Sequence, residues 1–268
     1  MTSSREKLVG AVTGAGSGIG RAVANKFGSV GADVAIVDVN PDSAQRAATE
    51  ISDEYGVRSR AFVADLSDPA ECRRVFDEVC EWGEPNYWIN NAGILRLASA
   101  LDTSDELFDQ VMDTNFRSVF VLSTAFAARV IARGDTGSIV NISSIHAVLS
   151  EPNAAVYTAA KGAIEACSRT FASEWAPLGV RVNSVRPGAT YTELTNPIYS
   201  EEIKRAIYQR VPMRRIAEAS EIAEAVYFLA SDLSSYCTGT TLDVDGGYIM
   251  DGSLPDIVYG DSDSSTSG

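Results

Sequence analysis

The feature that most constrains the fold is a glycine-rich turn near the amino terminus. Four glycines in seven residues follow the apolar run 8–13: Gly14, Gly16, Gly18 and Gly20. The amphipathic run 21–30 comes next. A strand that enters such a turn and leaves it as a helix brings bare backbone and free amide groups to one point, where a pyrophosphate can bind. The spacing differs from the commonest dinucleotide fingerprint, because three residues separate Gly14 from Gly18.

Apolar runs of strand length alternate with helical stretches along the rest of the chain. Further strand candidates are 34–37, 59–64, 87–89, 138–143, 180–185 and 240–244. This alternation predicts an α/β fold with a single doubly wound, Rossmann-like parallel sheet and helices on both faces. The 268 residues suit one large domain. We therefore predict one dinucleotide-binding and catalytic domain, residues 1–250, and an acidic tail, 251–268, that is disordered or packs on a neighbouring subunit.

Polar or small residues come directly after several of these strands. Asp38 follows the second strand, Asp65 the third, and the run 90–93, Asn-Asn-Ala-Gly, follows the fourth. Because the carboxyl ends of parallel strands meet at one edge of a sheet, where ligands bind, we expect these residues to line one crevice.

Asp38 bears on the choice of dinucleotide. A carboxylate at the end of the second strand accepts hydrogen bonds from the adenosine ribose and repels a 2′-phosphate, so it favours NAD over NADP. No arginine occupies positions 38–41, and Arg46 lies further along the next helix. The alternative is that Asp38 caps the helix beginning near Pro41, but Asn40 is better placed for that task.

Tyr157 and Lys161 form the pair with the clearest chemistry. They lie four residues apart in a helical stretch, so both side chains project from one face. A phenol titrates at about 10, and a fixed ammonium beside it favours the phenolate and lowers that pKa. Ser144 follows the apolar run 138–143, which predicts a hydroxyl at the carboxyl end of a buried strand. Such a Tyr/Lys pair is also common in packed helices, so its meaning depends on the rest of the chain.

Taken together, these segments resemble the short-chain dehydrogenase/reductase family, from about residue 7 to residue 250. The resemblance rests on the order and separation of the motifs: 13–20, Asp65, 90–93, Asn115, Ser144, Tyr157 with Lys161, and Arg186-Pro187-Gly188. It implies an NAD-dependent oxidoreductase that moves a hydride between the nicotinamide and a carbinol carbon.

The resemblance implies catalytic roles for four side chains. Tyr157 would exchange a proton with the substrate oxygen, and Ser144 would hold that oxygen. Lys161 would lower the Tyr157 pKa and bind the nicotinamide ribose, while Asn115 would anchor a water that links Lys161 to solvent. Ser143 is a rival to Ser144, but the family's thirteen-residue step to the tyrosine favours Ser144.

The resemblance also implies a set of cofactor contacts. The set is Gly14, Ser17, Gly18, Ile19, Gly20, Asp38, Asp65, Leu66, Asn91, Ala92, Gly93, Tyr157, Lys161, Pro187, Gly188, Thr190 and Thr192. Members from the glycine turn would contact the pyrophosphate or its ribose, and members from 187 onward the nicotinamide end. Several have plainer alternatives, since Asn115 can interrupt or cap a helix and Pro187-Gly188 can simply be a turn.

Composition narrows the class of protein. The formal charge of −14 excludes a general affinity for nucleic acid. The four cysteines show no metal-ligand spacing, and His146 is the one histidine, so we expect reduced thiols and no metal site. The sequence shows neither a signal-peptide core nor a run of membrane-span length. We expect a cytoplasmic protein that binds no membrane, and, as is usual in the family, a homotetramer that contacts through the apolar helices 119–131 and 164–175.

The substrate is the least determined part. In the family the pocket is walled by segments that correspond here to 94–97, 145–153 and 190–208. Four side chains in them are candidates for substrate contact: His146, Asn153, Leu95 and Tyr191. This mixed lining favours a sugar, sugar acid or polyol. Apolar secondary or cyclic alcohols are the alternative, followed by a 3-oxoacyl carrier-protein reductase or a non-catalytic NAD-binding regulator.

Overall fold

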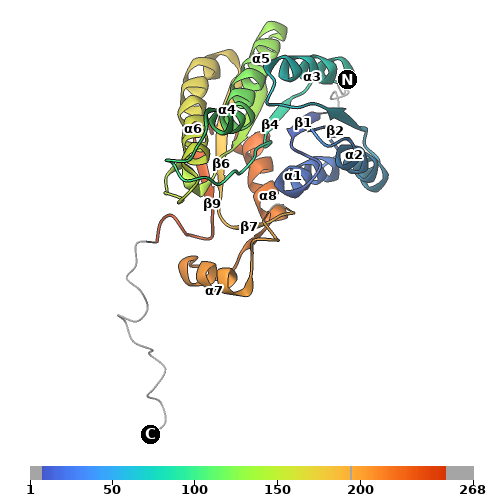
Figure 1. Cartoon of the computed structure of the whole chain (residues 1–268). Coiled ribbons are helices and arrows are strands. Elements are labelled where there is room, and N and C mark those ends of the chain that lie inside the picture. The colour runs from blue at the N-terminus through green and yellow to red at the C-terminus, as the bar shows by residue number, and fades with distance from the viewer. Residues whose placement is uncertain (1–7, 194, 252–268) are drawn as a thin grey trace.

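A seven-stranded parallel sheet forms the centre of the computed structural model, which describes residues 8–193 and 195–251 (Figure 1). The spatial order is β3-β2-β1-β4-β5-β6-β9. The strands are β1 (Val9–Thr13), β2 (Asp33–Asp38), β3 (Ser59–Val63), β4 (Tyr87–Asn90), β5 (Gly137–Ile142), β6 (Val180–Pro187) and β9 (Thr241–Val244). Every neighbouring pair is parallel. All seven correspond to strands predicted from the sequence, and the order reverses beside β1, between β1 and β4.

Helices cover both faces of this sheet, which confirms the predicted fold class. The helices are α1 (Gly18–Ser29), α2 (Pro41–Tyr55), α3 (Pro69–Trp82), α4 (Asp105–Met112), α5 (Ser118–Arg133), α6 (Ala155–Trp175), α7 (Glu201–Arg210) and α8 (Ala219–Ala230). One buried cluster joins α1, α2 and α8 to one face, and a second joins α3, α5 and α6 to the other. Successive strand residues alternate between the clusters: Val34 and Ile36 in the first, Ala35 and Val37 in the second.

Local sequence explains where helices begin. The Asn40 side chain accepts hydrogen bonds from the Asp42 and Ser43 amides, each at 3.0 Å, and Pro41 occupies the first turn. The prediction that Asn40 rather than Asp38 caps this helix is therefore confirmed. Asp68 and Pro69 start α3 in the same way.

Three short elements were not predicted. A separate two-stranded parallel sheet pairs β7 (Thr190–Tyr191) with β8 (Ala217–Glu218), and α7 follows β7 in the chain. Each strand has two residues, which is too short for a detectable alternation. Every residue of α7 is at least partly exposed, so this helix does not contribute to the buried core. Most of the predicted acidic tail, residues 252–268, lies outside the described residues.

The helical run Asp105–Arg133 is long and apolar enough to cross a membrane by length and composition, which the sequence analysis did not anticipate. In the fold this run contains α4, a π-helical turn (Asp113–Arg117) and α5. Its residues Leu122, Phe126 and Val130 are buried in the cluster under the sheet. Packing inside the fold therefore accounts for its apolar composition, as in other core helices.

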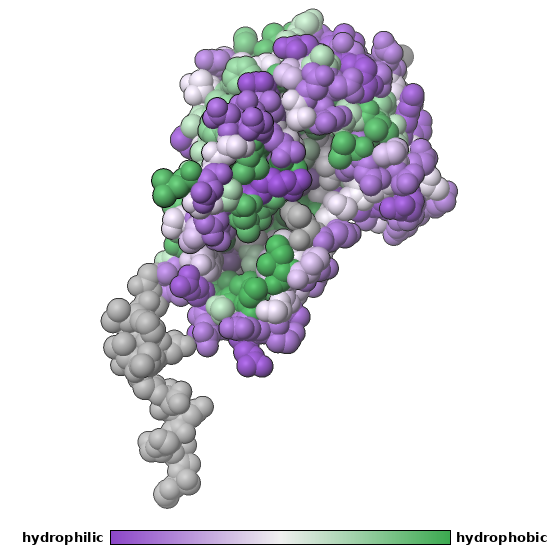
Figure 2. Space-filling model, in the orientation of Figure 1, coloured by the Kyte–Doolittle hydropathy of each residue, from purple (hydrophilic) through white to green (hydrophobic). Residues whose placement is uncertain are grey.

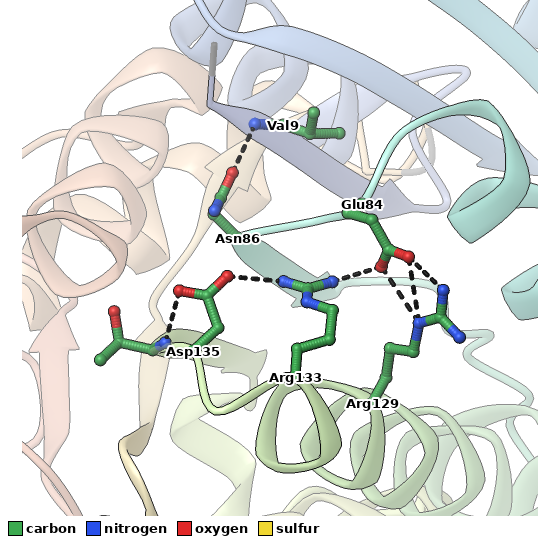
Figure 3. Close-up of polar contacts among 7 residues, drawn as sticks. Val9, Glu84, Asn86, Arg129, Arg133 and Asp135 are labelled. Carbon is green, nitrogen blue, oxygen red and sulfur yellow. Dashed lines mark hydrogen bonds and ion pairs between the residues drawn. The ribbon is translucent and has the colours of Figure 1, made fainter. Parts of the chain in front are cut away.

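A cluster of ion pairs lies at the amino-terminal edge of the sheet (Figure 3). Glu84, just before β4, pairs with Arg129 and Arg133 of α5. Arg133 also contacts Asp135 at 2.9 Å, and nearby Asn86 accepts a hydrogen bond from the Val9 amide at 2.9 Å. These contacts lie opposite the carboxyl edge, where the sequence places the candidate site.

Candidate active site

The glycine turn between β1 and α1 is locked to the end of β4. The Thr13 hydroxyl accepts hydrogen bonds from the Asn91 and Ala92 amides at 2.9 and 3.0 Å. In return, the Asn91 side-chain amide donates to the carbonyls of Thr13 and Gly14 at 2.9 and 3.1 Å. A Cβ at Gly20 would lie 2.2 Å from the Gly14 carbonyl oxygen, so the turn has no room for a side chain there. This compact bare backbone at a helix N-terminus fits a pyrophosphate.

Asp38 lies against this turn at the end of β2. Its carboxylate accepts hydrogen bonds from the Gly16 amide and the Asn40 amide, each at 2.9 Å. A Cβ at Gly16 would come within 2.9 Å of the same carboxylate, so Asp38 borders the cradle closely. Arg46 is exposed on α2. Asp38 thus places a carboxylate beside the glycine turn. This is the carboxylate that the sequence predicts to contact the adenosine ribose.

The two residues predicted to contact the adenine form hydrogen bonds mainly with residues close to them in the sequence. Asp65 accepts from the Ser67 amide at 3.0 Å and from its hydroxyl at 2.7 Å. The Leu66 side chain is buried in the core, and its carbonyl accepts from the Cys72 thiol at 3.3 Å. Both follow β3 at the carboxyl edge, as predicted.

The serine, the phenol and the ammonium lie together at this edge. Lys161 of α6 is 4% exposed, and its Nζ donates to the Ile142 carbonyl at 2.8 Å, at the end of β5. The Nζ lies 5.7 Å from the centre of the Tyr157 ring. Ser144 lies two residues after the end of β5, and its hydroxyl interacts with the Tyr157 phenol.

The pKa of Tyr157 differs from the sequence expectation. Burial raises this pKa above its ordinary value, and the hydrogen bond from Ser144 opposes the rise. Burial also lowers the pKa of Lys161 to about 8. The Tyr157 pKa therefore lies above its ordinary value and not below it, because the loss of solvent around the phenolate outweighs the effect of Ser144.

The two adjacent serines point to different surroundings. Ser143 donates to the Glu165 carboxylate at 2.6 Å, inside the protein. The Ser144 hydroxyl instead accepts from the His146 amide at 3.2 Å and meets Tyr157. The geometry favours Ser144 over its rival as the hydroxyl that faces a substrate.

Asn115 lies in the π-helical turn between α4 and α5 and is fully buried. Its side chain accepts from the Ile94 amide at 2.7 Å and donates to the Ile94 carbonyl at 2.8 Å. A Cβ at Gly93 would lie 3.2 Å from the Asn115 oxygen and 3.7 Å from Lys161 Nζ, so these groups converge. π-Turns of this kind are frequent at functional sites. Asn115 holds the loop after β4 and is not a helix cap.

The segment after β6 lies over the glycine turn. Thr190 is buried and donates to the Gly188 carbonyl at 3.0 Å, next to Pro187. A Cβ at Gly18 would lie 3.3 Å from the Thr192 side chain. The Glu193 carboxylate accepts from the Gly18 amide at 2.8 Å. Sequence reasoning missed this last contact, since the two residues are 175 positions apart.

The candidate substrate residues come from the loop after β4, the segment after β5 and the segment after β6. Figure 2 shows a hollow with apolar surface around it on the face in view. His146 Nε2 lies 3.6 Å from Glu151, and burial lowers the His146 pKa. Among the described residues, its buried Nδ1 has no hydrogen-bond partner. The hydroxyl of Tyr191 lies 3.4 Å from that of Tyr208 on α7.

The loop after β4 and the segment after β5 are joined to each other. Asn153 has a left-handed φ of 64°, and its carbonyl accepts from the Ala98 amide at 2.7 Å. Leu95 is half-buried, and Leu97 beside it is 62% exposed. These two segments therefore offer both polar and apolar groups to a ligand.

Metal chemistry finds no support among the residues that the structure describes. They contain no group of three or more His, Cys, Asp or Glu side chains able to hold a metal ion. The four cysteines are free thiols, as predicted.

A phosphate cradle beside a serine–tyrosine–lysine cluster defines an oxidoreductase of the nicotinamide-dependent class. Comparison with known proteins agrees. A family model described as Enoyl-(Acyl carrier protein) reductase matches residues 14–249. The chain belongs to the short-chain dehydrogenase/reductase family.

Individual relatives cover almost the whole chain. Galactitol 2-dehydrogenase (L-tagatose-forming) of Cereibacter sphaeroides is 40% identical over 243 residues, which are 90% of this chain and 94% of the relative. A 3-oxoacyl-(acyl-carrier-protein) reductase of Escherichia coli K12 is 36% identical and covers 91% of this chain and 98% of its own. A solved structure of a putative NAD(P) dependent gluconate 5-dehydrogenase from Beutenbergia cavernae, with NADP bound at low occupancy, has a TM-score of 0.87 and 37% identity, with 92% and 99% coverage.

Proposed function

We propose that the protein is an NAD-dependent dehydrogenase acting on a secondary alcohol or lactol carbon of a sugar, sugar acid or polyol, or on the corresponding carbonyl. The observation that carries this proposal is the cluster of Ser144, Tyr157, Lys161 and Asn115 beside the glycine turn. The nicotinamide, when bound, accepts or supplies the hydride. Residues 1–250 would act as one dinucleotide-binding and catalytic unit, and the chain would form a homotetramer.

The chain's own residues would handle the proton. In oxidation, the Tyr157 phenolate takes the proton of the substrate hydroxyl, while Ser144 holds the same oxygen. Lys161, with its Nζ 5.7 Å from the ring centre, would favour the phenolate while it carries its charge, that is, below its own pKa of about 8. Asn115 would hold a water that connects Lys161 with solvent. In reduction, the same phenol donates its proton to the carbonyl oxygen.

The residues of the cradle fit a dinucleotide, and Asp38 supports NAD as the form used. Its carboxylate borders the turn at the Gly16 amide, where a 2′-phosphate would meet a like charge. The related Beutenbergia cavernae structure contains NADP, so relatives do not decide the choice.

Asp38→Asn tests the cofactor assignment. We expect the wild type to favour NAD in kcat/KM, and the variant to shift the ratio toward NADP by about tenfold or more, equivalent to roughly 1.4 kcal/mol. Asp42→Asn on the exposed start of α2 is the matched control and should leave the ratio unchanged. A wild type that favours NADP contradicts the assignment.

The polar groups of the segment after β5 support a polyhydroxy substrate. His146, Glu151 and Asn153 would bind several hydroxyls at once. Similarity to galactitol 2-dehydrogenase and to the gluconate 5-dehydrogenase structure points to the same class. The exposed Leu97 favours the second candidate, an apolar secondary or cyclic alcohol.

A substrate panel distinguishes these possibilities. The purified protein is incubated with NAD and galactitol, gluconate or cyclohexanol, and with NADH and a 3-oxoacyl thioester, while the absorbance of the reduced nicotinamide is followed. We expect the highest kcat/KM with a polyol or sugar acid. Preference for cyclohexanol or for the thioester would favour the corresponding alternative, and NAD binding without any turnover would favour a regulator.

A further inference from the structure

Glu165 is a buried carboxylate close to the site for which the mechanism above has no use. It lies on α6, one turn after Lys161, and is 4% exposed. Three donors bind it: the Ser143 hydroxyl at 2.6 Å, and Nε and Nη2 of Arg186 at 2.9 and 2.7 Å. Buried carboxylates are costly unless they are paired in this way, so the arrangement needs an explanation.

The contacts of Glu165 continue those of Lys161. Lys161 holds the carbonyl of Ile142, and Glu165, one turn later on the same helix, holds the hydroxyl of the next residue, Ser143. Two consecutive residues at the end of β5 are therefore tied to two consecutive turns of α6. Ser144 comes directly after them, and Tyr157 is on that same helix.

Arg186 connects Glu165 to the nicotinamide side of the site. It lies on β6 directly before Pro187 and Gly188, and its bidentate contact with Glu165 fixes both position and orientation. Its remaining nitrogen, Nη1, contacts Asp243 of β9 at 2.5 Å. The negative charge of Glu165 is thus compensated by Arg186, and Glu165 links α6 to strands β5 and β6.

We propose that Glu165 is a positioning residue of this active site. Through Ser143 it sets the distance of the Ser144 hydroxyl from Tyr157, and through Arg186 it sets the distance of the Pro187–Gly188 turn from the same helix. The proposal rests on the proposed function, because it assigns Glu165 to the geometry of that reaction. Displacements of about 1 Å in such geometry can cost roughly 100-fold in rate.

Two variants of the full chain test this role. Glu165→Gln keeps the shape but removes the charge that holds Arg186, and Ser143→Ala breaks the link to β5 without changing any charge. We expect kcat to fall about 10- to 100-fold in the first and about 3- to 10-fold in the second. The dissociation constant of NADH should stay within about threefold. Glu174→Gln, an exposed position on the same helix, is the matched control.

A second readout does not depend on turnover. The ultraviolet titration of the Tyr157 phenol, obtained by subtracting the curve of Tyr157→Phe, reports whether Ser144 still contacts it, because this hydrogen bond opposes the rise of the phenol pKa. Both variants should raise that pKa. If the wild type has no turnover, the proposed function fails, and the titration still decides the positioning role.

Three results would overturn the proposal: an unchanged kcat in folded Glu165→Gln, an unchanged phenol pKa in both variants, or a pKa that falls in Glu165→Gln and stays constant in Ser143→Ala. The last result would show that the charge of Glu165 changes the phenol pKa and that its contact with Ser143 does not. Circular dichroism of each variant establishes that it is folded.

Discussion

At the scale of single residues, the environment of Tyr157 governs how the reaction responds to pH. Burial raises its pKa, so the phenol is protonated at neutral pH, and oxidation needs the phenolate. We therefore expect kcat/KM for alcohol oxidation to rise as pH increases toward the Tyr157 pKa, and the rate of carbonyl reduction to fall over the same range.

Ser144→Ala tests the cause of this profile. The hydrogen bond of Ser144 opposes the rise of the Tyr157 pKa. Loss of this hydrogen bond should therefore move the pH profile of oxidation to higher pH and lower the maximum rate. Thr158→Ala, on the next helical position, should leave the profile in place. A Ser144→Ala profile that moves to lower pH would contradict this assignment.

Residues whose proposed role follows from their own side-chain chemistry could be predicted from the sequence. Residues whose role depends on contacts with distant parts of the chain could not. Tyr157, Lys161 and Ser144 are near one another in the chain and lie together in the fold. Glu165 and Arg186 are 21 positions apart and pair only because β6 lies beside β5 and α6 packs on it. No local pattern contains that information.

A buried polar network beneath the site also depends on contacts that the sequence alone does not predict. The Asn90 side chain donates to Asn141 at 2.7 Å, and Asn141 donates to Ser168 at 2.8 Å. From the sequence, Asn90 is among the residues expected to line the crevice. Its amide is instead satisfied inside the core, by Asn141 of β5 and Ser123 of α5, which the topology brings next to β4.

At the scale of elements, the glycine turn is the part most sensitive to substitution. A Cβ at Gly20 would lie 2.2 Å from the Gly14 carbonyl oxygen and 2.4 Å from the Asn91 amide nitrogen. We expect Gly20→Ala to lower the free energy of unfolding by more than about 3 kcal/mol, since a backbone atom cannot give way easily.

Gly83→Ala is the matched control. A Cβ at Gly83 would have its nearest neighbour at 3.5 Å, an ordinary contact, and the backbone there is extended with φ −175°. The free energy of unfolding of this variant should change by less than about 1 kcal/mol. Urea unfolding of both variants measures the difference, and equal stability of the two would refute the close-packing argument.

Helices and strands with a regular apolar pattern were predicted well. Elements that depend on contacts between residues far apart in the sequence were not. The five inner strands of the main sheet were located because they are buried on both faces and read as apolar runs. The edge strands β3 and β9 were also located, although most of their residues are partly or fully exposed. The π-turn around Asn115 carries no such pattern. Its place follows from the contact between Asn115 and Ile94, 21 positions apart.

At the scale of the whole molecule, the cluster around Glu84 ties α5 to the amino-terminal edge of the sheet (Figure 3). The hydrogen bond from Arg129 is the main cause that lowers the pKa of Glu84. A carboxyl with a lowered folded pKa stabilises the fold above its unfolded pKa, about 4.3, and this contribution is lost as pH falls through the folded pKa.

Glu84→Gln should therefore reduce stability at pH 7, by up to about 1 kcal/mol because the side chain is partly exposed. The difference from the wild type should shrink below about pH 4. Glu81→Gln, exposed on α3, is the control. Urea midpoints across this pH range measure the effect, and a variant as stable as the wild type at pH 7 would contradict it.

The central claim is that the fold gathers a hydroxyl, a phenol and an ammonium beside a dinucleotide cradle, and that Tyr157 moves the proton. Turnover of a polyol or sugar acid by Tyr157→Phe, measured together with NADH binding by fluorescence, tests it most directly. The account predicts a loss of about 10²- to 10⁴-fold in kcat with NADH binding retained. Turnover that persists at the wild-type rate in this variant would contradict it.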